Sequence, residues 1–354
     1  MLYSKLGDTG LVVSRLALGT MTFTGGSGNA AIAKTGQSDA DAIVARAIDG
    51  GINFFDTADI YAGGESEQIL GKALGNRRDE VVIATKAGWR AGAPLNRSGL
   101  SATHLHWSID RSLKNLGTDH VDVYIAHRND AHTPLEETLF ALDAIVRAGK
   151  ARYLGVSNWP AWKVAAAIEL QRANGWAQFS HVQMYYSLLG RGVEGEVLPM
   201  AKHYGIGLTA WSPLAGGFLS GKYTRESLSD AENRLSGFDM IPFDKDQGFA
   251  LVETMRSIAA AHDATVAQVA LAWVLSRPQV ASVLVGASRL SQLDDNIAAA
   301  DLALTADDLA TLDAATKPIL DFTVGVTQVP DGPIVNALAA VPGGAPDLKA
   351  VPVV

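Results

Sequence analysis

Four side chains that can hold or transfer a proton follow three short apolar runs of the chain: Asp56, Tyr61, Lys86 and His127. A phenol has a pKa near ~10 and donates its proton poorly at neutral pH unless a nearby cation stabilises the phenolate. We expect Lys86 to be that cation and Asp56 to hold it in its charged form. His127 can hydrogen-bond the reacting oxygen and stabilise its charge. The pattern predicts an enzyme acting on an oxygen that gains charge, such as a carbonyl oxygen during hydride transfer.

Two other interpretations of these residues stay open. Strand ends often carry Asp, Lys or His only to satisfy the end of the strand, but a lysine that closes the apolar run 81–84 is seldom needed for a core. A barrel glycosidase with Asp56 and Glu65 as its two carboxylates is the other alternative, and it leaves Lys86 and Tyr61 without a role. The combination over three successive units favours oxidoreduction.

The elements that must position these side chains alternate between short apolar runs and longer helical patterns, as in βα units around a parallel sheet. Strands are expected at residues 15–18, 53–56, 81–85, 121–126, 153–156, 181–184, 207–211 and 282–285. Helices are expected at residues 39–49, 66–74, 102–116, 135–148, 161–173, 196–204, 249–261 and 266–276, with Ser38, Ser101 and Thr265 as N-terminal caps. Eight strands predict an α/β protein of the (β/α)8 TIM-barrel class, whose site lies at the carboxyl ends of the strands.

Segments outside the βα units complete the expected architecture. Residues 3–14 predict an N-terminal β-hairpin, because Gly-Asp-Thr-Gly at 7–10 is typical of a turn, and we expect it to close the floor of the barrel. Long loops follow three of the strands and are expected on the catalytic, C-terminal face, at 22–37, 88–99 and 216–247. Residues 1–315 are predicted to form a single barrel domain, and residues 316–354 an irregular C-terminal extension.

The composition limits the partners of the protein. The chain carries 37 acidic and 29 basic side chains, so no basic face is expected for a nucleic acid or an anionic membrane. It has no cysteine, which excludes disulfides and thiolate metal sites. No metal site is predicted, and scattered histidines are expected at the surface or in caps: His120, His132, His181, His203 and His262. Without an evident signal sequence or membrane span, a cytoplasmic protein with a small-molecule substrate is expected, as a monomer or a homo-oligomer.

Short motifs are distributed in a fixed order along residues 3–315. They are Gly19-Thr20, Phe55-Asp56-Thr57-Ala58 with Tyr61, Thr85-Lys86, Asp122-Val123-Tyr124-Ile125-Ala126-His127-Arg128, Gly155-Val156-Ser157-Asn158, Val182-Gln183, Ala210-Trp211-Ser212-Pro213-Leu214 and Gly286-Ala287-Ser288-Arg289. With these motifs the chain resembles the aldo-keto reductase family, most of all its bacterial and potassium-channel β-subunit-like branches.

The resemblance implies a catalytic tetrad of Asp56, Tyr61, Lys86 and His127, with Tyr61 as general acid in carbonyl reduction and general base in alcohol oxidation. It also implies a nicotinamide cofactor that lies extended across the strand ends. The matching cofactor-binding positions are Gly19, Thr20, Met21, Asp56, Ser157, Asn158, Gln183, Trp211, Ser212, Pro213, Leu214, Gly216, Lys222, Arg234, Gly286, Ser288, Arg289, Gln292, Asp295 and Asn296.

Three parts of the cofactor are matched by separate groups of these residues. By resemblance, Ser157, Asn158 and Gln183 hold the carboxamide, and Trp211 stacks on the nicotinamide ring or simply packs at its strand end. The segment 212–217 resembles a strap over the pyrophosphate, in which small residues allow the backbone to approach closely. In the loop that follows, Lys222 and Arg234 match cationic positions of the channel-subunit-like branch or are solvated surface charges.

The segment 286–296 matches the positions that bind the adenosine end of the cofactor. Arg289 and Ser288 offer a cation and a hydroxyl group suited to a 2'-phosphate, so NADPH (NADP+) is expected in preference to NADH. Gly286 and Ala287 stand where the family often has a lysine.

The substrate pocket is expected among aromatic and apolar residues near the strand ends. Its candidate residues are Phe23, Tyr61, Trp89, Ala126, His127 and Trp159. Ala126 is small and precedes His127, so we expect room there for a bulky ketone. Residues 26–31 fit a G-x-G-x-x-A dinucleotide fingerprint, but no helix begins at the glycines, and a flexible loop beside the substrate mouth is expected instead.

The expected function is therefore reversible, NADPH-dependent reduction of an aldehyde or ketone to the alcohol. The alternative is an NADPH-binding regulatory subunit of the channel-associated type with slow turnover. The resemblance implies that this branch departs from the family at the position where the chain keeps His127. An enzyme is therefore favoured.

Overall fold

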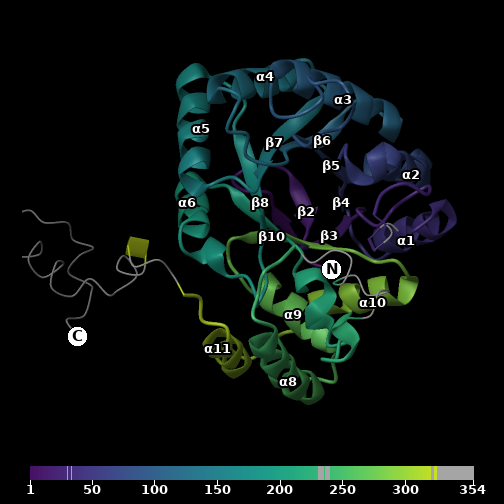
Figure 1. Ribbon diagram of the computed structural model, residues 1–354, viewed down its shortest axis with the longest axis vertical. Helices are drawn as coiled ribbons and strands as arrows, with labels where there is room; N and C mark the ends of the chain where they lie inside the picture. The colour runs from purple at the N-terminus through teal and green to yellow at the C-terminus, as the bar shows by residue number, and fades with distance from the viewer. Residues whose placement is uncertain (30, 33, 230–234, 236–239, 320–322, 325–354) are drawn as a thin grey trace, which may run out of the picture. The chain divides into compact units, whose positions relative to one another are not determined.

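The computed structural model describes residues 1–29, 31–32, 34–229, 235, 240–319 and 323–324. Within them, eight parallel strands close into a barrel in the order β10-β3-β4-β5-β6-β7-β8-β9 (Figure 1). The strands are β3 (Leu16–Gly19), β4 (Phe54–Asp56), β5 (Val82–Ala87), β6 (Val121–Ala126), β7 (Ala151–Ser157), β8 (Phe179–Tyr185), β9 (Gly207–Trp211) and β10 (Val280–Val285). The predicted TIM barrel is confirmed.

Helices flank the barrel on its outside, labelled as in Figure 1. They are α1 (Gln37–Asp49), α2 (Glu65–Leu74), α3 (Ala102–Leu116), α4 (Leu135–Arg147), α5 (Ala161–Asn174), α6 (Val197–Tyr204), α8 (Lys245–Ala261), α9 (Val266–Leu275), α10 (Leu290–Ala298) and α11 (Ala306–Ala315). The last two were not predicted. Ser101 and Thr265 cap α3 and α9 as expected, but Ser38 is not a cap, because α1 already begins after Gly36 without any side-chain cap.

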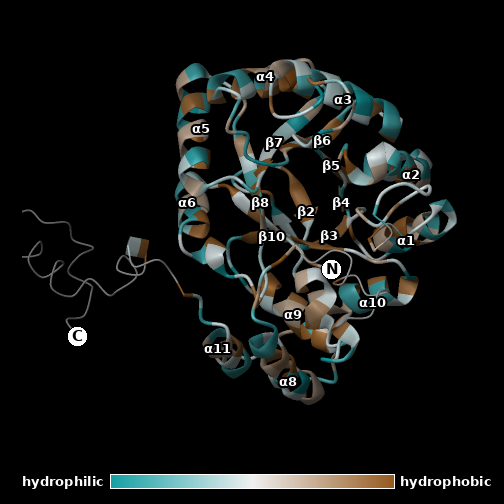
Figure 2. Cartoon of the chain, viewed as in Figure 1, coloured by the Kyte–Doolittle hydropathy of each residue, from teal (hydrophilic) through white to brown (hydrophobic). Residues whose placement is uncertain are grey.

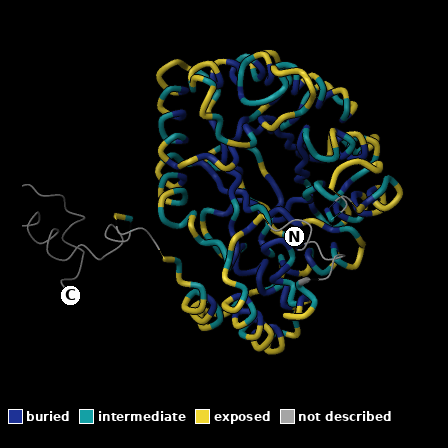
Figure 3. The backbone as a smooth tube through the Cα atoms, viewed as in Figure 1, coloured by how far each residue is buried: buried dark blue, intermediate teal, exposed yellow. Residues whose placement is uncertain are grey.

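The strands separate two apolar cores. On β5, Val82 and Ala84 belong to the core inside the barrel, whereas Ile83 and Ala87 belong to the larger core between strands and helices. In Figure 2 the strands are not uniformly hydrophobic, because β7 and β8 also contain Arg152, His181 and Gln183. The strands are mostly buried in Figure 3, while exposed residues gather on the outer helices. Because side chains alternate along a strand, Lys86 falls on the interior side, at the carboxyl end of β5.

The predicted N-terminal hairpin is present, with β1 (Tyr3–Lys5) paired antiparallel to β2 (Val12–Ser14). Leu6 and Val13 are fully buried and belong to the core inside the barrel. Ala281, near the start of β10, lies in the same core. The hairpin therefore packs against the floor, where the strands begin.

The chain divides into two units, of which Met1–Lys317 contains the barrel. Of Pro318–Val354 only residues 318–319 and 323–324 are described, so the predicted irregular extension lies largely outside the described residues. The boundary at residue 315 stays a prediction. In the described part of the chain no single helix is long and apolar enough to cross a membrane, although α8 and α9, bent by 92°, pass that test as a pair by length and composition.

Candidate active site

A buried ion pair lies at the carboxyl ends of β4 and β5. Lys86 Nζ lies 2.5 Å from Asp56 Oδ1 and donates a second hydrogen bond to the Thr57 carbonyl oxygen at 2.7 Å. The other carboxylate oxygen of Asp56 accepts a hydrogen bond from Gln183 Nε2 at 2.8 Å. Burial opposes the charge of Lys86, but the attraction of Asp56 and Tyr61 outweighs it and raises the pKa of the lysine. The lysine is therefore held charged.

Tyr61 opens a short 3-10 turn, Tyr61–Gly64, that follows β4. Its ring centroid lies 5.0 Å from Lys86 Nζ and 5.9 Å from the His127 ring, which it meets edge to face. Burial raises the pKa of Tyr61 above its usual 10.0, and the charge of Lys86 opposes this shift without cancelling it. Lys86 thus acts in the expected direction, but the phenol is not made more acidic overall. It keeps its proton at neutral pH, as a general acid must.

His127 follows β6, and its backbone N–H donates to the Ala87 carbonyl oxygen at 2.8 Å. Burial, together with the charges of Lys86 and Arg128, lowers the pKa of its imidazole well below 6.5. Its Nδ1 is buried and has no hydrogen-bond partner among the described residues. A neutral imidazole beside a protonated phenol can hydrogen-bond an oxygen placed between them.

The residues expected at the carboxamide lie at the ends of β7, β8 and β9. Ser157 and Gln183 are in register on neighbouring strands. Asn158, with φ +58°, donates from Nδ2 to Ser157 Oγ at 2.9 Å, and its Oδ1 accepts from Trp211 Nε1 at 3.1 Å. The structure brings these side chains together as one polar group with the half-buried indole of Trp211 at its edge.

The expected strap turns back sharply after β9. Ser212 and Gly216 have φ values of +52° and +70°, and the Ser212 hydroxyl accepts from the Gly216 N–H at 2.9 Å. Between them, Pro213 is buried and Leu214 packs against the core. Positive φ is costly for a residue other than glycine, so Ser212 is held there by its surroundings.

Other expected cofactor positions are more scattered. Gly19 pairs in register with Asp56, and Thr20 is buried with its hydroxyl already hydrogen-bonded inside the protein. Met21 is partly exposed and Lys222 is exposed. Arg234 lies outside the described residues.

The segment expected at the adenosine end comprises the loop before α10 and most of that helix. Gly286 is exposed, and a Cβ added to it would meet nothing within 4 Å. Asn296 Nδ2 donates to the Gly286 carbonyl oxygen at 3.3 Å, and Gln292 Oε1 accepts from the Ser288 hydroxyl at 3.1 Å. Arg289 is exposed and has no ion pair with a described carboxylate. The segment thus offers a free cation beside open space.

Asp295 has a different environment from the other residues of that segment. Its carboxylate accepts hydrogen bonds from the Thr265 hydroxyl at 3.1 Å and from Gln268 Nε2 at 2.8 Å. These two residues form the capping box of α9. Asp295 therefore ties α10 to the start of α9, a structural role that the sequence did not indicate.

The structure separates the expected substrate residues into two groups. Trp89 is 41% exposed, and its ring centroid lies 6.2 Å from that of His127. Phe23 and Trp159 are 0% and 2% exposed and belong to the core between strands and helices. Ala126 also lies in that core and is fully buried. It has no surface toward a pocket, so it does not provide the expected room for a ketone.

The glycine-rich loop after β3 is anchored to α2. The N–H groups of Gly25 and Ser27 donate to Glu65 Oε2 at 2.8 and 3.1 Å, and the Ser27 hydroxyl donates to Oε1 at 2.8 Å. These hydrogen bonds lower the pKa of Glu65, and the bond from the Ser27 hydroxyl has the largest effect. The loop that was expected to be flexible is tied down at residues 25–27. Both carboxylate oxygens of Glu65 accept hydrogen bonds from this loop. The glycosidase alternative, which needs Glu65 as its second catalytic carboxylate, is therefore not supported.

One histidine expected at the surface is fully buried instead. His181 points into the barrel, where a Cβ on Gly155 would collide with its ring. Burial, followed by the charge of Lys86, lowers its pKa to about 3. The prediction of a surface position was wrong, because a neutral imidazole fits a core once its neighbour is glycine.

A polar network behind the site was missed by the sequence analysis. Asp59 is fully buried, and its Oδ2 accepts from the Ser108 hydroxyl at 2.6 Å. Glu67 is also fully buried and accepts from Thr85 Oγ1 at 2.6 Å and from Asn115 Nδ2 at 2.9 Å. No motif marks either acid, because their burial depends on donors from other elements.

Asp59 makes the stability of the protein depend on pH. Burial and the charge of Glu67 outweigh the effects of Ser108, Arg111 and Lys86, and the pKa of Asp59 rises from 3.8 to about 7. The folded state therefore binds a proton that the unfolded state has lost, and stability falls as pH rises from about 4 through about 7.

We expect Asp59→Asn to remove this loss. Between pH 4 and pH 8 the free energy of unfolding of the wild type should fall by roughly 2–4 kcal/mol more than that of the variant. Urea unfolding at both pH values measures the difference, with the exposed Asp307→Asn as control. Equal pH dependence in the wild type and Asp59→Asn would show that Asp59 ionises normally.

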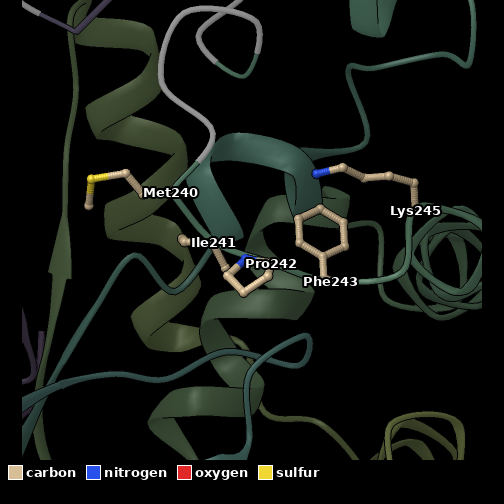
Figure 4. Close-up of a pocket in the computed structure, with 5 residues that line it drawn as sticks. All are labelled: Met240, Ile241, Pro242, Phe243 and Lys245. Atoms are coloured by element: carbon tan, nitrogen blue, oxygen red, sulfur yellow. The ribbon is translucent and has the colours of Figure 1, made fainter.

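A surface pocket lies at the start of α8, with a volume of about 390 Å³ (Figure 4). It is lined by Met240, Ile241, Pro242, Phe243 and Lys245. None of these residues is among the predicted catalytic, cofactor or substrate positions.

Comparison with known proteins identifies the family. The Aldo/keto reductase family matches residues 15–317. A "Probable voltage-gated potassium channel subunit beta" of Oryza sativa subsp. japonica is 38% identical over 310 residues, covering 85% of this chain and 92% of the relative. An "Uncharacterized oxidoreductase" of Bacillus subtilis (strain 168) is 37% identical over 326 residues, covering 88% and 95%. The "Versiconal hemiacetal acetate reductase" of Aspergillus parasiticus is 33% identical over 340 residues, covering 90% and 98%. Together with the barrel, these matches show that the chain belongs to the aldo/keto reductase family.

Proposed function

We propose that the protein is an NADPH-dependent oxidoreductase that reduces an aldehyde or ketone to the alcohol. The observation that carries this proposal is the contact of Tyr61 with Lys86 and His127, in which the lysine is fixed by Asp56 at 2.5 Å. The family uses nicotinamide cofactors and includes relatives named as an oxidoreductase and a reductase. A small-molecule substrate and a cytoplasmic location belong to the same proposal.

Each side chain has a distinct task in this reaction. Bound NADPH supplies the hydride. Tyr61 donates its phenolic proton to the carbonyl oxygen, and the charge of Lys86 stabilises the phenolate that remains. Neutral His127 hydrogen-bonds the same oxygen and orients the carbonyl. Asp56 keeps Lys86 charged and in place, and Gln183 fixes Asp56.

The residues present suit a nicotinamide dinucleotide. Trp211 presents a half-buried indole beside the exposed side chain of Asn158, which suits a flat ring with a carboxamide. Gly286 leaves open space, and Arg289 adds an exposed cation. The group at Ser157 and Asn158 would hold the carboxamide, and Arg289 would bind the 2'-phosphate.

The cofactor preference tests this assignment. With a panel of aldehydes, sugars, ketosteroids and quinones, we expect loss of NADPH absorbance for at least one carbonyl class. Arg289→Gln should lower kcat/KM for NADPH by about tenfold and for NADH by less than ~2-fold, because only NADPH carries the 2'-phosphate. Arg172→Gln, on the exposed face of α5, is the control. Equal losses with both cofactors would contradict the role of Arg289.

The second candidate is an NADPH-binding regulatory subunit with slow turnover. It is favoured by the relative from Oryza sativa subsp. japonica, whose name is that of a channel subunit. The same assay separates the two functions. Tight NADPH binding without turnover of any carbonyl in the panel would favour the regulatory function.

A further inference from the structure

Four arginines in α3 and in the loops after β5 and β6 form no ion pair with a described carboxylate: Arg90, Arg97, Arg111 and Arg128. Elsewhere in the described chain Arg15, Arg152 and Arg289 form none either, whereas nine arginines do: Arg46, Arg77, Arg78, Arg147, Arg172, Arg191, Arg225, Arg256 and Arg277. In a protein with net charge -8, the four cations of α3 and these loops are not offset by an ion pair with a described carboxylate.

Arg128 is the member of this group that lies beside the reacting groups. Its guanidinium carbon lies 4.3 Å from the ring centroid of Trp89, and Trp89 meets the His127 ring edge to face at 6.2 Å. Its charge contributes to lowering the pKa of His127. The guanidinium therefore lies on a ring that also contacts His127.

Both Trp89 and Arg128 present exposed surface. Trp89 is 41% exposed, and Arg128 is exposed with one long hydrogen bond, from Nε to the Asn129 carbonyl oxygen at 3.4 Å. A guanidinium stacked on an aromatic face keeps its in-plane N–H groups available. The stacked guanidinium of Arg128 thus presents N–H donors close to His127.

The nearest acid in sequence, Asp130, forms no ion pair with Arg128. Asp130 is engaged by the Leu100 N–H at 2.8 Å, the His132 N–H at 2.8 Å and the Thr133 hydroxyl at 2.6 Å. Lys163 Nζ donates to the Asp130 carbonyl oxygen at 2.8 Å and adds a further cation. The carboxylate of Asp130 is thus bonded to other donors, and the terminal N–H groups of Arg128 remain for a ligand.

Two more arginines reinforce the same side of the site. Arg97 and Arg111 lie over the ring of Trp107, at 4.3 and 5.4 Å. Arg111 also donates to the carbonyl oxygens of Gly63, in the Tyr61 turn, and of Ala91 at 3.3 Å. Positive charge on this side raises the local concentration of anions and speeds their association.

We propose that the natural carbonyl substrate carries an oxyanion group, a carboxylate or a phosphate, which Arg128 binds on the Trp89 ring while the carbonyl oxygen lies between Tyr61 and His127. This inference rests on the proposed carbonyl reduction. It adds the substrate class and a specificity residue. Arg128 acts on binding and orientation, whereas proton transfer stays with Tyr61.

The first test compares carbonyl substrates of equal shape and different charge. With NADPH, the wild type should reduce 4-formylbenzoate with a kcat/KM at least about tenfold above that for 4-formylbenzamide. Arg128→Gln should lower this ratio by about tenfold, because one charge-assisted pair is lost. Arg152→Gln, an exposed arginine at the start of β7, should leave the ratio unchanged. No anion preference in the wild type, or an unchanged ratio in Arg128→Gln, would overturn the inference.

The second test does not depend on turnover. Calorimetric titration should show that 4-(hydroxymethyl)benzoate binds the wild type more tightly than 4-(hydroxymethyl)benzamide, and that Arg128→Gln removes most of the difference. Equal affinities would overturn the inference even if carbonyls are reduced. If no carbonyl is reduced, the proposed function fails while this titration still decides on the anion site. A parallel assay with 4-formylphenyl phosphate shows which oxyanion is preferred.

Discussion

Replacing Tyr61 with phenylalanine is expected to lower kcat for carbonyl reduction by about 10²–10⁴-fold, the range typical for removal of a general acid. The ring contacts with Lys86 and His127 need no hydroxyl, so the packing and the affinity for NADPH should change little. The change removes the proton donor and the hydrogen bond between this hydroxyl and Lys86.

Two measurements identify this loss as chemical. Single-turnover rates with saturating NADPH should fall with kcat, while the dissociation constant for NADPH stays within about twofold. Tyr204→Phe, at the end of α6, is the matched control and should keep wild-type rates. Retention of full activity in Tyr61→Phe would assign the acid to another group.

The same residue sets the expected pH dependence of the two directions. Because burial raises the pKa of Tyr61 above 10.0, the acid form needed for reduction is present throughout the neutral range. Reduction should be flat across neutral pH, and oxidation, which needs the phenolate, should rise toward alkaline pH.

Breaking the Asp56–Lys86 pair is expected to have the second large effect. Lys86→Met leaves a buried carboxylate without its cation and removes the donor to the Thr57 carbonyl oxygen. Asp56→Asn leaves a buried ammonium group without its anion. Each single variant should lose about 3–5 kcal/mol in the free energy of unfolding, together with nearly all activity.

A double-mutant cycle tests the pair. In Asp56→Asn/Lys86→Met neither charge remains, so the double variant should be destabilised by clearly less than the sum of the two single changes. Since folding raises the pKa of Lys86, the stability from its charge is present at neutral pH and is lost only as pH rises through that raised value. Strict additivity of the two changes in urea unfolding at pH 7 would show that the pair is not coupled.

The barrel strands could be predicted because each is a short apolar run with a clear boundary. Two helices could not be predicted in the same way. In α11 only Leu312 is buried, so this helix lacks the apolar stripe that marks a helix in sequence. In α10 the apolar residues Leu290, Leu293 and Ile297 have helical spacing, but the helix is only 9 residues long. The start of α10 also has no side-chain cap.

The proximity of Asp56, Tyr61, Lys86 and His127 could be predicted from the sequence because topology alone brings strand ends together. Ala126 was harder to place, because β6 is apolar on both faces and the sequence does not show which side chains point inward. Asp59 depends on Ser108, which lies 49 residues away, and Glu67 on Thr85, 18 residues away. A buried acid whose donors come from separate elements has no local signature.

The barrel can close only late in the synthesis of the chain. Strand β3 pairs with β10, with Leu16 opposite Val283, so the first barrel strand receives its last neighbour only when nearly the whole barrel has been made. All four tetrad residues leave the ribosome long before that, in a sheet with two free edges that are open to wrong pairing. A fragment that stops before β10 would contain every tetrad residue but not the closed sheet that holds them in place.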